Sequence, residues 1–359
     1  MARTKLLVSA ITFAVTLAVP MWTVSVGPTT PAAMGDAPAG TASTGGMDMT
    51  SATGGGDTAS GTDGGTVDWK TMDAQMAERD KSFPAATKGE GAQVLEPKVL
   101  ADGTKEFDLT TKVVQWEVEP GKTVEAWTYN GMVPGPTIHV NVGDKVRVVL
   151  KNELPESTVI HWHGLVIPNA MDGVADVTQD PVPPGKSFTY AFTAKEQMVG
   201  WYHSHHDGTK QVTNGLFGTI LIGEVPLPAE AKNAKVSQEI PMVIQDAGNI
   251  GMTINGKSFP GTKAVHTKVG DWIEVHYINA GTMAHPMHLH GMAQLIIAKD
   301  GYPLPEPYRA DTVNVAPGER YTVLIHTTEP GTWAWHCHIF PHAEGSQGMF
   351  GLFTELLVA

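Results

Sequence analysis

The chain has 359 residues and a formal net charge of −13, and 42% of its residues are hydrophobic. This length and apolar fraction suffice for two domains of ordinary size, and the negative charge argues against nucleic acid as a partner. Charged residues make up only 17%, whereas glycine (39) and proline (25) are abundant, which favours an all-β fold rich in turns. The single cysteine excludes an internal disulfide.

The N-terminal residues predict export. Arg3 and Lys5 precede an apolar run that ends near Val19, and small residues follow it, as is typical of a secretory signal peptide. The apolar character continues weakly to Val26, so an uncleaved membrane anchor is the alternative for residues 1–30. We therefore expect an exported protein that is extracellular, periplasmic or held at the cell surface.

The next two segments differ in composition. Residues 31–66 are rich in glycine, alanine, threonine and serine, and this composition predicts a disordered linker because it buries little apolar surface. Residues 67–94 contain a predicted short helix, which Asp68 caps and whose apolar residues recur at helical spacing from Trp69 to Met76. We expect this helix to pack on the outside of the first domain.

From residue 95 onward the pattern is that of short strands. The alternating segments 137–142 and 145–150 flank a Gly-Asp turn, and the same arrangement recurs around Gly270. Each copy is followed by a histidine-rich motif, which indicates an internal repeat. The repeat predicts two tandem β-sandwich domains, at 95–225 and 238–359, joined by a segment rich in proline and alanine.

Four His-x-His pairs stand out, two in each repeat. They are His161 and His163, His203 and His205, His288 and His290, and His336 and His338. Residues i and i+2 of a strand point to the same side, so each pair presents two imidazoles on one face. Eight imidazoles suit a cluster of about three metal ions, and copper, zinc, iron and nickel all favour such ligands.

Strand parity predicts a second, separate site. Cys337 lies between two histidines of the last pair and therefore faces the opposite side of its strand. His285 has odd parity relative to its neighbouring pair, and His342 follows a proline bend. One thiolate, two imidazoles and a weak axial ligand match a blue-copper site. Met349 is the preferred axial candidate, and Gln347 is the alternative.

The two predicted sites share a short stretch of chain. Cys337 would bind the single copper, while its neighbours His336 and His338 would bind the cluster. Covalent bonds therefore connect electron donor and acceptor, and no separate carrier is needed.

From Phe107 to Leu357 the sequence resembles the multicopper oxidase family, specifically its two-domain small-laccase branch. The resemblance includes residues 129–136 as well as the four histidine motifs. It implies cupredoxin-like Greek-key sandwiches and four coppers per chain, namely one type 1, one type 2 and a type 3 pair. The implied ligands are His161 and His288 for type 2; His163, His203, His205, His290, His336 and His338 for type 3; and His285, Cys337, His342 and Met349 for type 1.

The resemblance also implies an activity and an assembly. Phenols, aromatic amines or metal ions would give up single electrons, and four electrons would reduce dioxygen to water. Asp172 matches a family carboxylate that relays protons, with an ordinary Asp-Gly turn as the alternative. Two-domain members form a homotrimer in which the trinuclear site lies between subunits.

Two other functions compete with the oxidase. A copper nitrite reductase shares the two-domain trimeric design, but it carries its blue-copper cysteine in the first domain, where this chain has His203-Ser204-His205. A non-enzymatic copper-binding protein would be expected to have broken sites. All the expected ligand positions are filled here, so both alternatives are disfavoured.

Overall fold

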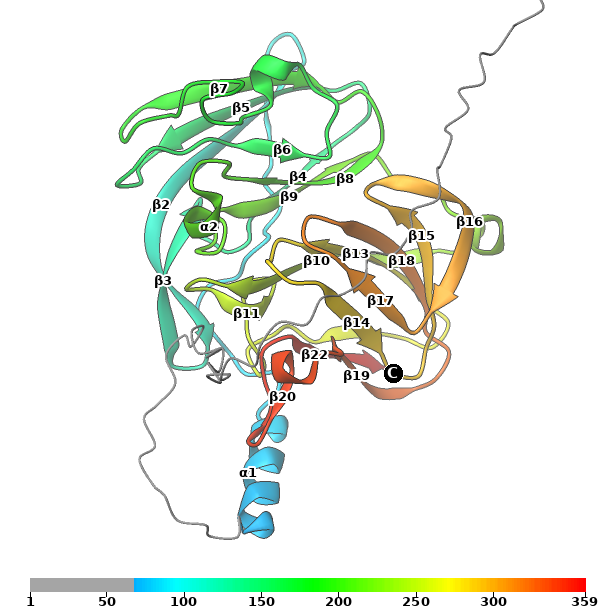
Figure 1. Ribbon diagram of the computed structural model, residues 1–359. Coiled ribbons are helices and arrows are strands. Elements are labelled where there is room, and N and C mark those ends of the chain that lie inside the picture. The colour runs from blue at the N-terminus through cyan, green and yellow to red at the C-terminus, as the bar shows by residue number, and fades with distance from the viewer. Residues whose placement is uncertain (1–67) are drawn as a thin grey trace, which may run out of the picture. The chain divides into compact units, whose positions relative to one another are not determined.

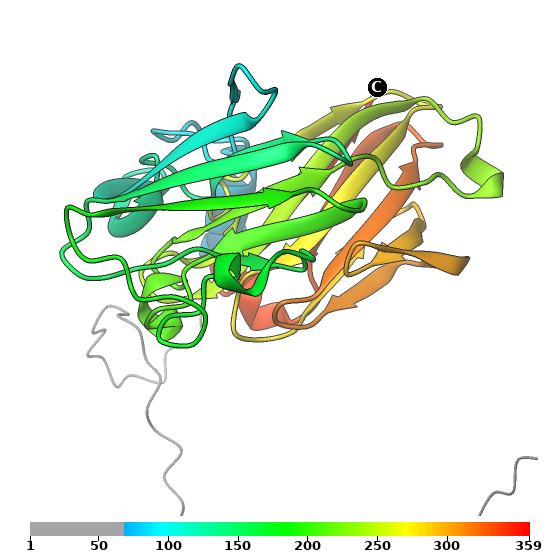
Figure 2. The same ribbon diagram turned by 90° about the horizontal axis from the view of Figure 1, so that it is seen from above.

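The computed structural model describes residues 68–359, which fall within one compact unit, Gly65–Ala359. The predicted signal segment (1–30) and linker (31–66) lie outside the described residues. Two β-sandwiches make up nearly all of this unit, and the predicted all-β fold class is confirmed (Figures 1 and 2). In the described part of the chain, no helix has the length and apolar character needed to span a membrane.

The first sandwich contains two sheets. One has the order β1-β2-β5-β7 with β3 paired to β2, and the other has the order β4-β9-β8-β6. Their strands are β1 (Lys98–Val99), β2 (Lys105–Glu119), β3 (Lys122–Tyr129), β4 (Gly135–Val140), β5 (Lys145–Asn152), β6 (His161–His163), β7 (Ser187–Thr193), β8 (Met198–His203) and β9 (Phe217–Ile222).

The second sandwich also has two main sheets, in the orders β11-β10-β13-β18-β15-β16 and β12-β22-β19-β14-β17, and a small β20-β21 hairpin. Their strands are β10 (Val236–Ala247), β11 (Gly251–Ile254), β12 (Val265–Thr267), β13 (Trp272–Asn279), β14 (His285–Leu289), β15 (Gln294–Lys299), β16 (Tyr302–Ala310), β17 (Thr312–Val315), β18 (Arg320–His326), β19 (Gly331–Cys337), β20 (Glu344–Gly345), β21 (Gly348–Met349) and β22 (Phe353–Val358).

Along β13, side chains that face the core of the second sandwich alternate with side chains that face the interface between the two sandwiches. On β13, Val275 and Tyr277 point into the core of the second sandwich. Ile278 faces the other way and packs with Trp201 and Phe217 of the first sandwich. Burial of apolar side chains on both faces of β13 therefore holds the two sandwiches together.

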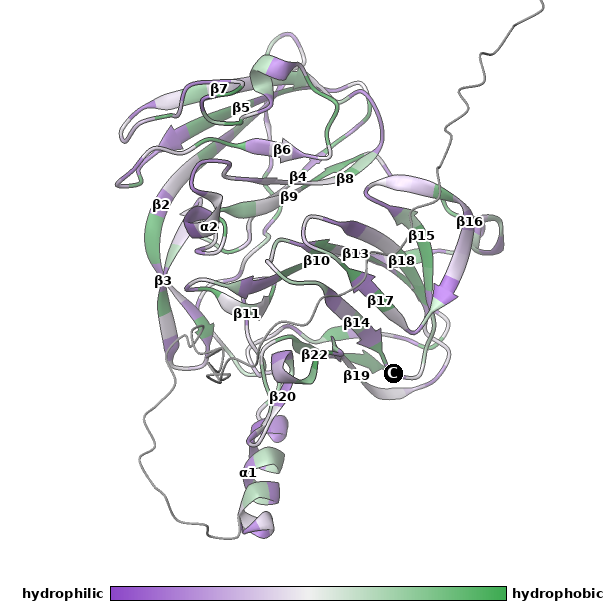
Figure 3. Cartoon of the chain, in the orientation of Figure 1, coloured by the Kyte–Doolittle hydropathy of each residue, from purple (hydrophilic) through white to green (hydrophobic). Residues whose placement is uncertain are grey.

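The predicted helix is present as α1 (Trp69–Lys81), and the side chain of Asp68 accepts a hydrogen bond from the backbone of Lys70 at its start. The predicted packing of α1 is wrong for most of its contacts, because the helix packs mainly against β21 of the second sandwich and reaches the first sandwich through the ion pair of Arg79 with Glu119. It has no buried residue, and hydrophilic segments alternate with apolar ones along its ribbon (Figure 3). Arg79 attaches α1 to the sandwiches through hydrogen bonds to the carbonyl of Met349 and to the side chain of Glu119.

The remaining helical segments are short connections. They are α2 (Gly208–Gln211) and the single 3₁₀ turns η1 (Asn169–Met171), η2 (Ala229–Ala231) and η3 (Phe340–His342).

Candidate metal centres

Three buried side chains of the second sandwich converge on one point. The Sγ atom of Cys337 lies 3.6 Å from Nδ1 of His285 and 3.7 Å from Nδ1 of His342, and the two nitrogens are 3.3 Å apart. A point equidistant from these atoms lies about 2 Å from each, close to ordinary metal–nitrogen and metal–sulfur bond lengths. The structure thus forms a trigonal site of two nitrogens and one sulfur.

Local backbone pairing brings these residues together. Strand β14, which begins at His285, pairs antiparallel with β19, and Met287 lies opposite Cys337. The 3₁₀ turn η3 follows, with Pro341 in its first turn, and returns the chain so that His342 faces the cysteine. Cys337 is fully buried in the second core, as its strand parity predicts.

The chemistry of Cys337 fits a metal ligand. Burial raises the pKa of its thiol to about 11, so the thiol keeps its proton at neutral pH while no cation is present. A bound cation reverses this preference, because coordination removes the thiol proton. The two imidazoles beside the thiol are the donors that such a site needs.

No sequence motif marks Asp246, which lies on β10. Its Oδ2 accepts hydrogen bonds from Nε2 of His285 at 2.9 Å and from the backbone of Met283, and its Oδ1 accepts from the backbone and hydroxyl of Thr282. Burial alone would raise the pKa of Asp246, but these donors bring it down to about 2. The ionised carboxylate fixes the His285 ring so that Nδ1 faces Cys337. Asp246 is distant in sequence and has no motif, so only the fold reveals it.

The two axial candidates occupy different surroundings. Met349 is partly buried on β21 and packs against Phe259 and Phe353. Gln347 is exposed and lines a surface depression beside α1.

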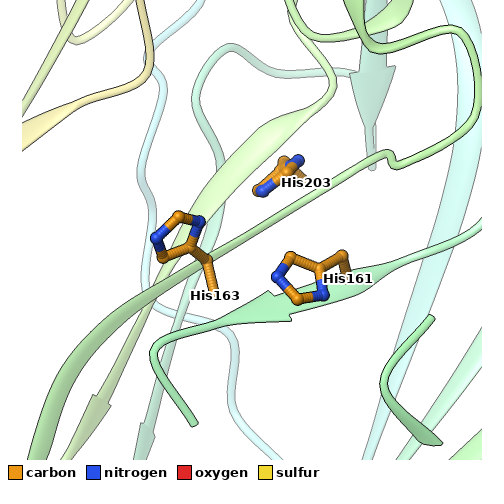
Figure 4. Close-up of side chains that lie close together, drawn as sticks. All are labelled: His161, His163 and His203. Atoms are coloured by element: carbon orange, nitrogen blue, oxygen red, sulfur yellow. The ribbon is translucent and has the colours of Figure 1, made fainter. Parts of the chain in front are cut away.

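The two histidine pairs of the first sandwich form one group. β6 pairs antiparallel with β8, so that His161 lies opposite His203. Ligand atoms of His161, His163 and His203 lie within 4.8 Å of one another (Figure 4). The ring of His205 is 5.5 Å from that of His161. Four imidazoles from two adjacent strands therefore cluster.

Hydrogen bonds orient several of these rings. Nδ1 of His161, His203 and His336 lies 2.8, 2.9 and 3.0 Å from the backbone carbonyl oxygens of Asp172, Ser204 and Cys337, respectively. Each donation fixes the tautomer, so that the unprotonated Nε2 can coordinate a metal.

Burial keeps two imidazoles of the first sandwich in their neutral form. It lowers the pKa of His163 to about 4 and that of His203 to about 3. Nε2 of His203 is buried and has no hydrogen-bond partner among the described residues. An unpartnered buried nitrogen is costly unless something binds it, so the group fits a metal cluster.

The pairs of the second sandwich form a matching group on β14 and β19. His288 lies opposite His336, and its ring is 4.7 Å from His290 and 5.4 Å from His338. Nε2 of His290 lies 3.1 Å from Nε2 of His336. His290 and His338 are exposed to solvent, so this group lies open at the surface.

The two groups lie on separate sandwiches. The first is on β6 and β8, and the second is on β14 and β19, in the other half of Figure 1. Within residues 68–359, ring contacts and hydrogen bonds connect histidines inside each group, and none joins one group to the other.

Asp172 lies beside the first group. Its Oδ1 is 3.5 Å from Nδ1 of His161, and its backbone carbonyl accepts from the same nitrogen. A Cβ atom at Gly173 would lie 1.7 Å from the carbonyl oxygen of Ile160, and Gly173 has a φ of +79°. Only glycine fits there, and the tight turn brings Asp172 to His161.

Comparisons with known proteins agree with this geometry. Family models described as multicopper oxidase match residues 110–226 and 231–356. The chain is 30% identical over 266 residues to Laccase-1 of Cryptococcus neoformans var. grubii, covering 62% of this chain and 41% of the laccase. It is 29% identical to the multicopper oxidase mco of Staphylococcus aureus, covering 71% of this chain and 59% of that protein.

The solved structures that resemble this chain include members of the same family. The blue copper oxidase of Nitrosomonas europaea is 33% identical, with a TM-score of 0.64 over 70% of this chain and 85% of its own. The multicopper oxidase mgLAC is 34% identical, with a TM-score of 0.65 over 70% of this chain and 86% of its own.

The chain spans less than half the length of the curated laccases it matches first, but two family models together cover most of its β-sandwich region. The buried two-histidine, one-cysteine site and the clustered histidine pairs lie within the matched segments. This protein belongs to the multicopper oxidase family, and the resemblance seen in its sequence is confirmed.

Proposed function

We propose that the protein is a laccase-like oxidase that couples one-electron oxidation of a small reductant to four-electron reduction of dioxygen to water. When bound, coppers at these centres would accept single electrons and deliver them to dioxygen. The observation that carries the proposal is the position of Cys337, which belongs to the buried trigonal site and lies between His336 and His338 of the exposed histidine group. The chain itself thus provides a covalent path between the two centres.

The proposed ligand sets follow the family pattern. His285, Cys337 and His342 would hold the type 1 copper, and Met349 is the preferred axial ligand because Gln347 is exposed beside α1. His161 and His288 would hold the type 2 copper. The type 3 pair would use His163, His203, His205, His290, His336 and His338.

The surrounding residues would position these ligands and handle protons. The carbonyl oxygens of Asp172, Ser204 and Cys337 hold imidazole rings with Nε2 unprotonated. Asp172 is partly exposed and lies next to His161, which suits a carboxylate that passes protons from solvent to reduced oxygen. Phenols, aromatic amines and metal ions are the proposed reductants.

We also propose a homotrimer and export from the cytoplasm. Two half-clusters lie on different sandwiches, and the second is open at the surface; this suits a head-to-tail contact between subunits, and such contacts close into rings. Export rests on the basic and apolar N-terminal segment.

Oxygen uptake by the copper-loaded protein tests the activity. We expect uptake with a phenol, about four coppers per chain by metal analysis, and strong blue absorption that Cys337→Ser abolishes. Nitrite serves as the competing substrate. Nitric oxide production from nitrite without oxygen uptake, or one copper or fewer per chain, would overturn the proposal.

A further inference from the structure

A second kind of metal-ligating cluster lies apart from the candidate copper ligands. It consists of the carboxylates of Glu239 and Glu274 and the imidazole of His276, and one donor atom from each lies within 4.8 Å of the others. None of the three residues belongs to the histidine motifs that the sequence displays.

The sheet of the second sandwich builds this cluster. β10 and β13 run parallel, side by side (Figure 1), with Glu239 opposite Glu274. His276 follows Glu274 by two residues and therefore lies on the same face of β13. The alternate residue Val275 points into the second core. The cluster therefore lies on the face turned toward the first sandwich, where Ile278 also packs.

His276 is fully buried and its ring is held from both sides. Nδ1 lies 3.0 Å from the hydroxyl of Thr322, and Nε2 lies 3.0 Å from Oε1 of Glu239. Nε2 also lies 3.8 Å from Oε1 of Glu274. Nε2 of His276 thus lies between the two carboxylates, while the hydroxyl of Thr322 fixes the orientation of the ring. A residue that hydrogen-bonds the second nitrogen of a metal-binding histidine has the same role.

The surroundings of Glu274 give a second, independent indication of a cation-binding site. Only 8% of the residue is exposed, and its Oε1 is buried without a hydrogen-bond partner among the described residues. A buried carboxylate oxygen without a donor is energetically costly. Glu224 adds negative charge nearby, and in the described part of the chain neither cluster glutamate forms an ion pair with lysine or arginine.

We propose that Glu239, Glu274 and His276 bind a divalent first-row cation, with zinc the best match. Zinc takes imidazole nitrogen and carboxylate oxygen at about 2.0–2.2 Å and favours four ligands, so water would complete the shell. The Glu239 side chain is 40% exposed, which gives the ion and its water access from solvent. Such an ion would join β10 to β13 beside the contact between the sandwiches.

Zinc binding by the copper-loaded protein tests the proposal. The protein is incubated with zinc, desalted, and analysed for zinc and copper per chain, and its thermal unfolding is followed with and without zinc. We expect one retained zinc per chain, unchanged copper and blue absorption, and a zinc-dependent rise in Tm. Glu274→Gln and Glu239→Gln should each abolish both the retained zinc and the rise in Tm.

Two control variants keep the result specific. His266→Gln removes an exposed strand histidine, and Glu306→Gln removes an exposed carboxylate outside the cluster, so both should retain zinc. Glu239→Gln changes a half-exposed side chain and guards against a folding defect caused by the buried substitution. No retained zinc in the wild-type protein, equal zinc in all variants, or copper lost as zinc is gained would overturn the proposal.

Discussion

Nε2 of His285 lies 2.9 Å from Oδ2 of Asp246, and both side chains are wholly inaccessible to solvent. The carboxylate also accepts hydrogen bonds from Thr282 and Met283. It therefore anchors the start of β14, the strand that contributes His285 to the candidate blue-copper site.

Asp246→Asn should destabilise the protein and disturb the blue site. The substitution keeps the shape but loses the charge that accepts these donors, so we expect a loss of about 1.5–3 kcal/mol in the free energy of unfolding. The His285 ring would lose its fixed orientation, which should shift the blue absorption band and the reduction potential. Urea denaturation and redox titration measure the two effects. An unchanged spectrum would show that Asp246 does not position the ligand.

Arg79 should stabilise the loop that contains the axial candidate. Its Nε donates to the carbonyl of Met349 at 2.5 Å, and its Nη2 donates to Glu119 and to the carbonyl of Phe259, each at 2.8 Å. Arg79→Ala should cost about 2 kcal/mol and broaden or shift the blue band, because β21 loses its contact with α1. Thermal unfolding and the visible spectrum check this.

Arg79→Lys and Lys81→Ala are the matched variants for this contact. Lysine retains the charge but not the fork of donors, so Arg79→Lys should restore only part of the stability. Lys81 lies on the same helix and is exposed, and Lys81→Ala should behave like the wild-type protein. Equal stability of Arg79→Ala and the wild-type protein would contradict the docking role.

Met349 and Gln347 can be distinguished by their effect on the reduction potential. Met349→Leu removes the proposed axial ligand, and we expect the potential of the blue site to rise, because the axial ligand tunes this potential. Gln347→Ala should leave it unchanged, since Gln347 lies exposed beside α1. Redox titration compares the two variants. A change caused by Gln347→Ala alone would reverse the assignment.

The stability of the copper-free protein should depend on pH through two buried histidines. Burial lowers the pKa of His163 to about 4 and that of His203 to about 3, whereas unfolded histidine titrates near about 6.5. The unfolded chain therefore binds more protons between these values, so the free energy of unfolding falls as pH falls from about 6.5 toward 4.

Urea denaturation of the copper-free protein at pH 7 and pH 5 measures this dependence. Burial raises the pKa of the carboxyl groups of Glu274 and Glu355, and this contribution is common to the wild-type protein and a histidine variant, so the comparison between them reports on histidine. His203→Gln should reduce the difference, because it removes the most strongly shifted group. Identical unfolding free energies at the two pH values would contradict the role of burial.

The sequence predicted many of the candidate ligands, because the side of a strand on which a residue lies depends only on its spacing along that strand. Parity placed Cys337 on the face opposite its neighbouring histidines, and the structure buries it in the second core. Parity could not reveal Asp246 or Glu239, because they meet their partners through pairing and packing of β10 with distant strands. The docking of α1 was mispredicted for a related reason, since the acceptors of Arg79 lie far from it in sequence, at Glu119, Phe259 and Met349.

Complementation between inactive variants tests whether the histidine cluster forms between subunits. His203→Ala breaks the first-sandwich group, and His336→Ala breaks the second-sandwich group, so each variant alone should lose oxygen uptake. In mixed rings, some contacts would join an intact first sandwich to an intact second sandwich of the next subunit. In a random, equal mixture, each intersubunit site has about a one-in-two chance of an intact first-sandwich group and the same chance of an intact second-sandwich group. About a quarter of the wild-type oxygen uptake should therefore return. A mixture of His203→Ala with His163→Ala should stay inactive, because both substitutions lie in the same group. If the first mixture stays inactive too, although size measurements show mixed trimers, the cluster does not form between subunits.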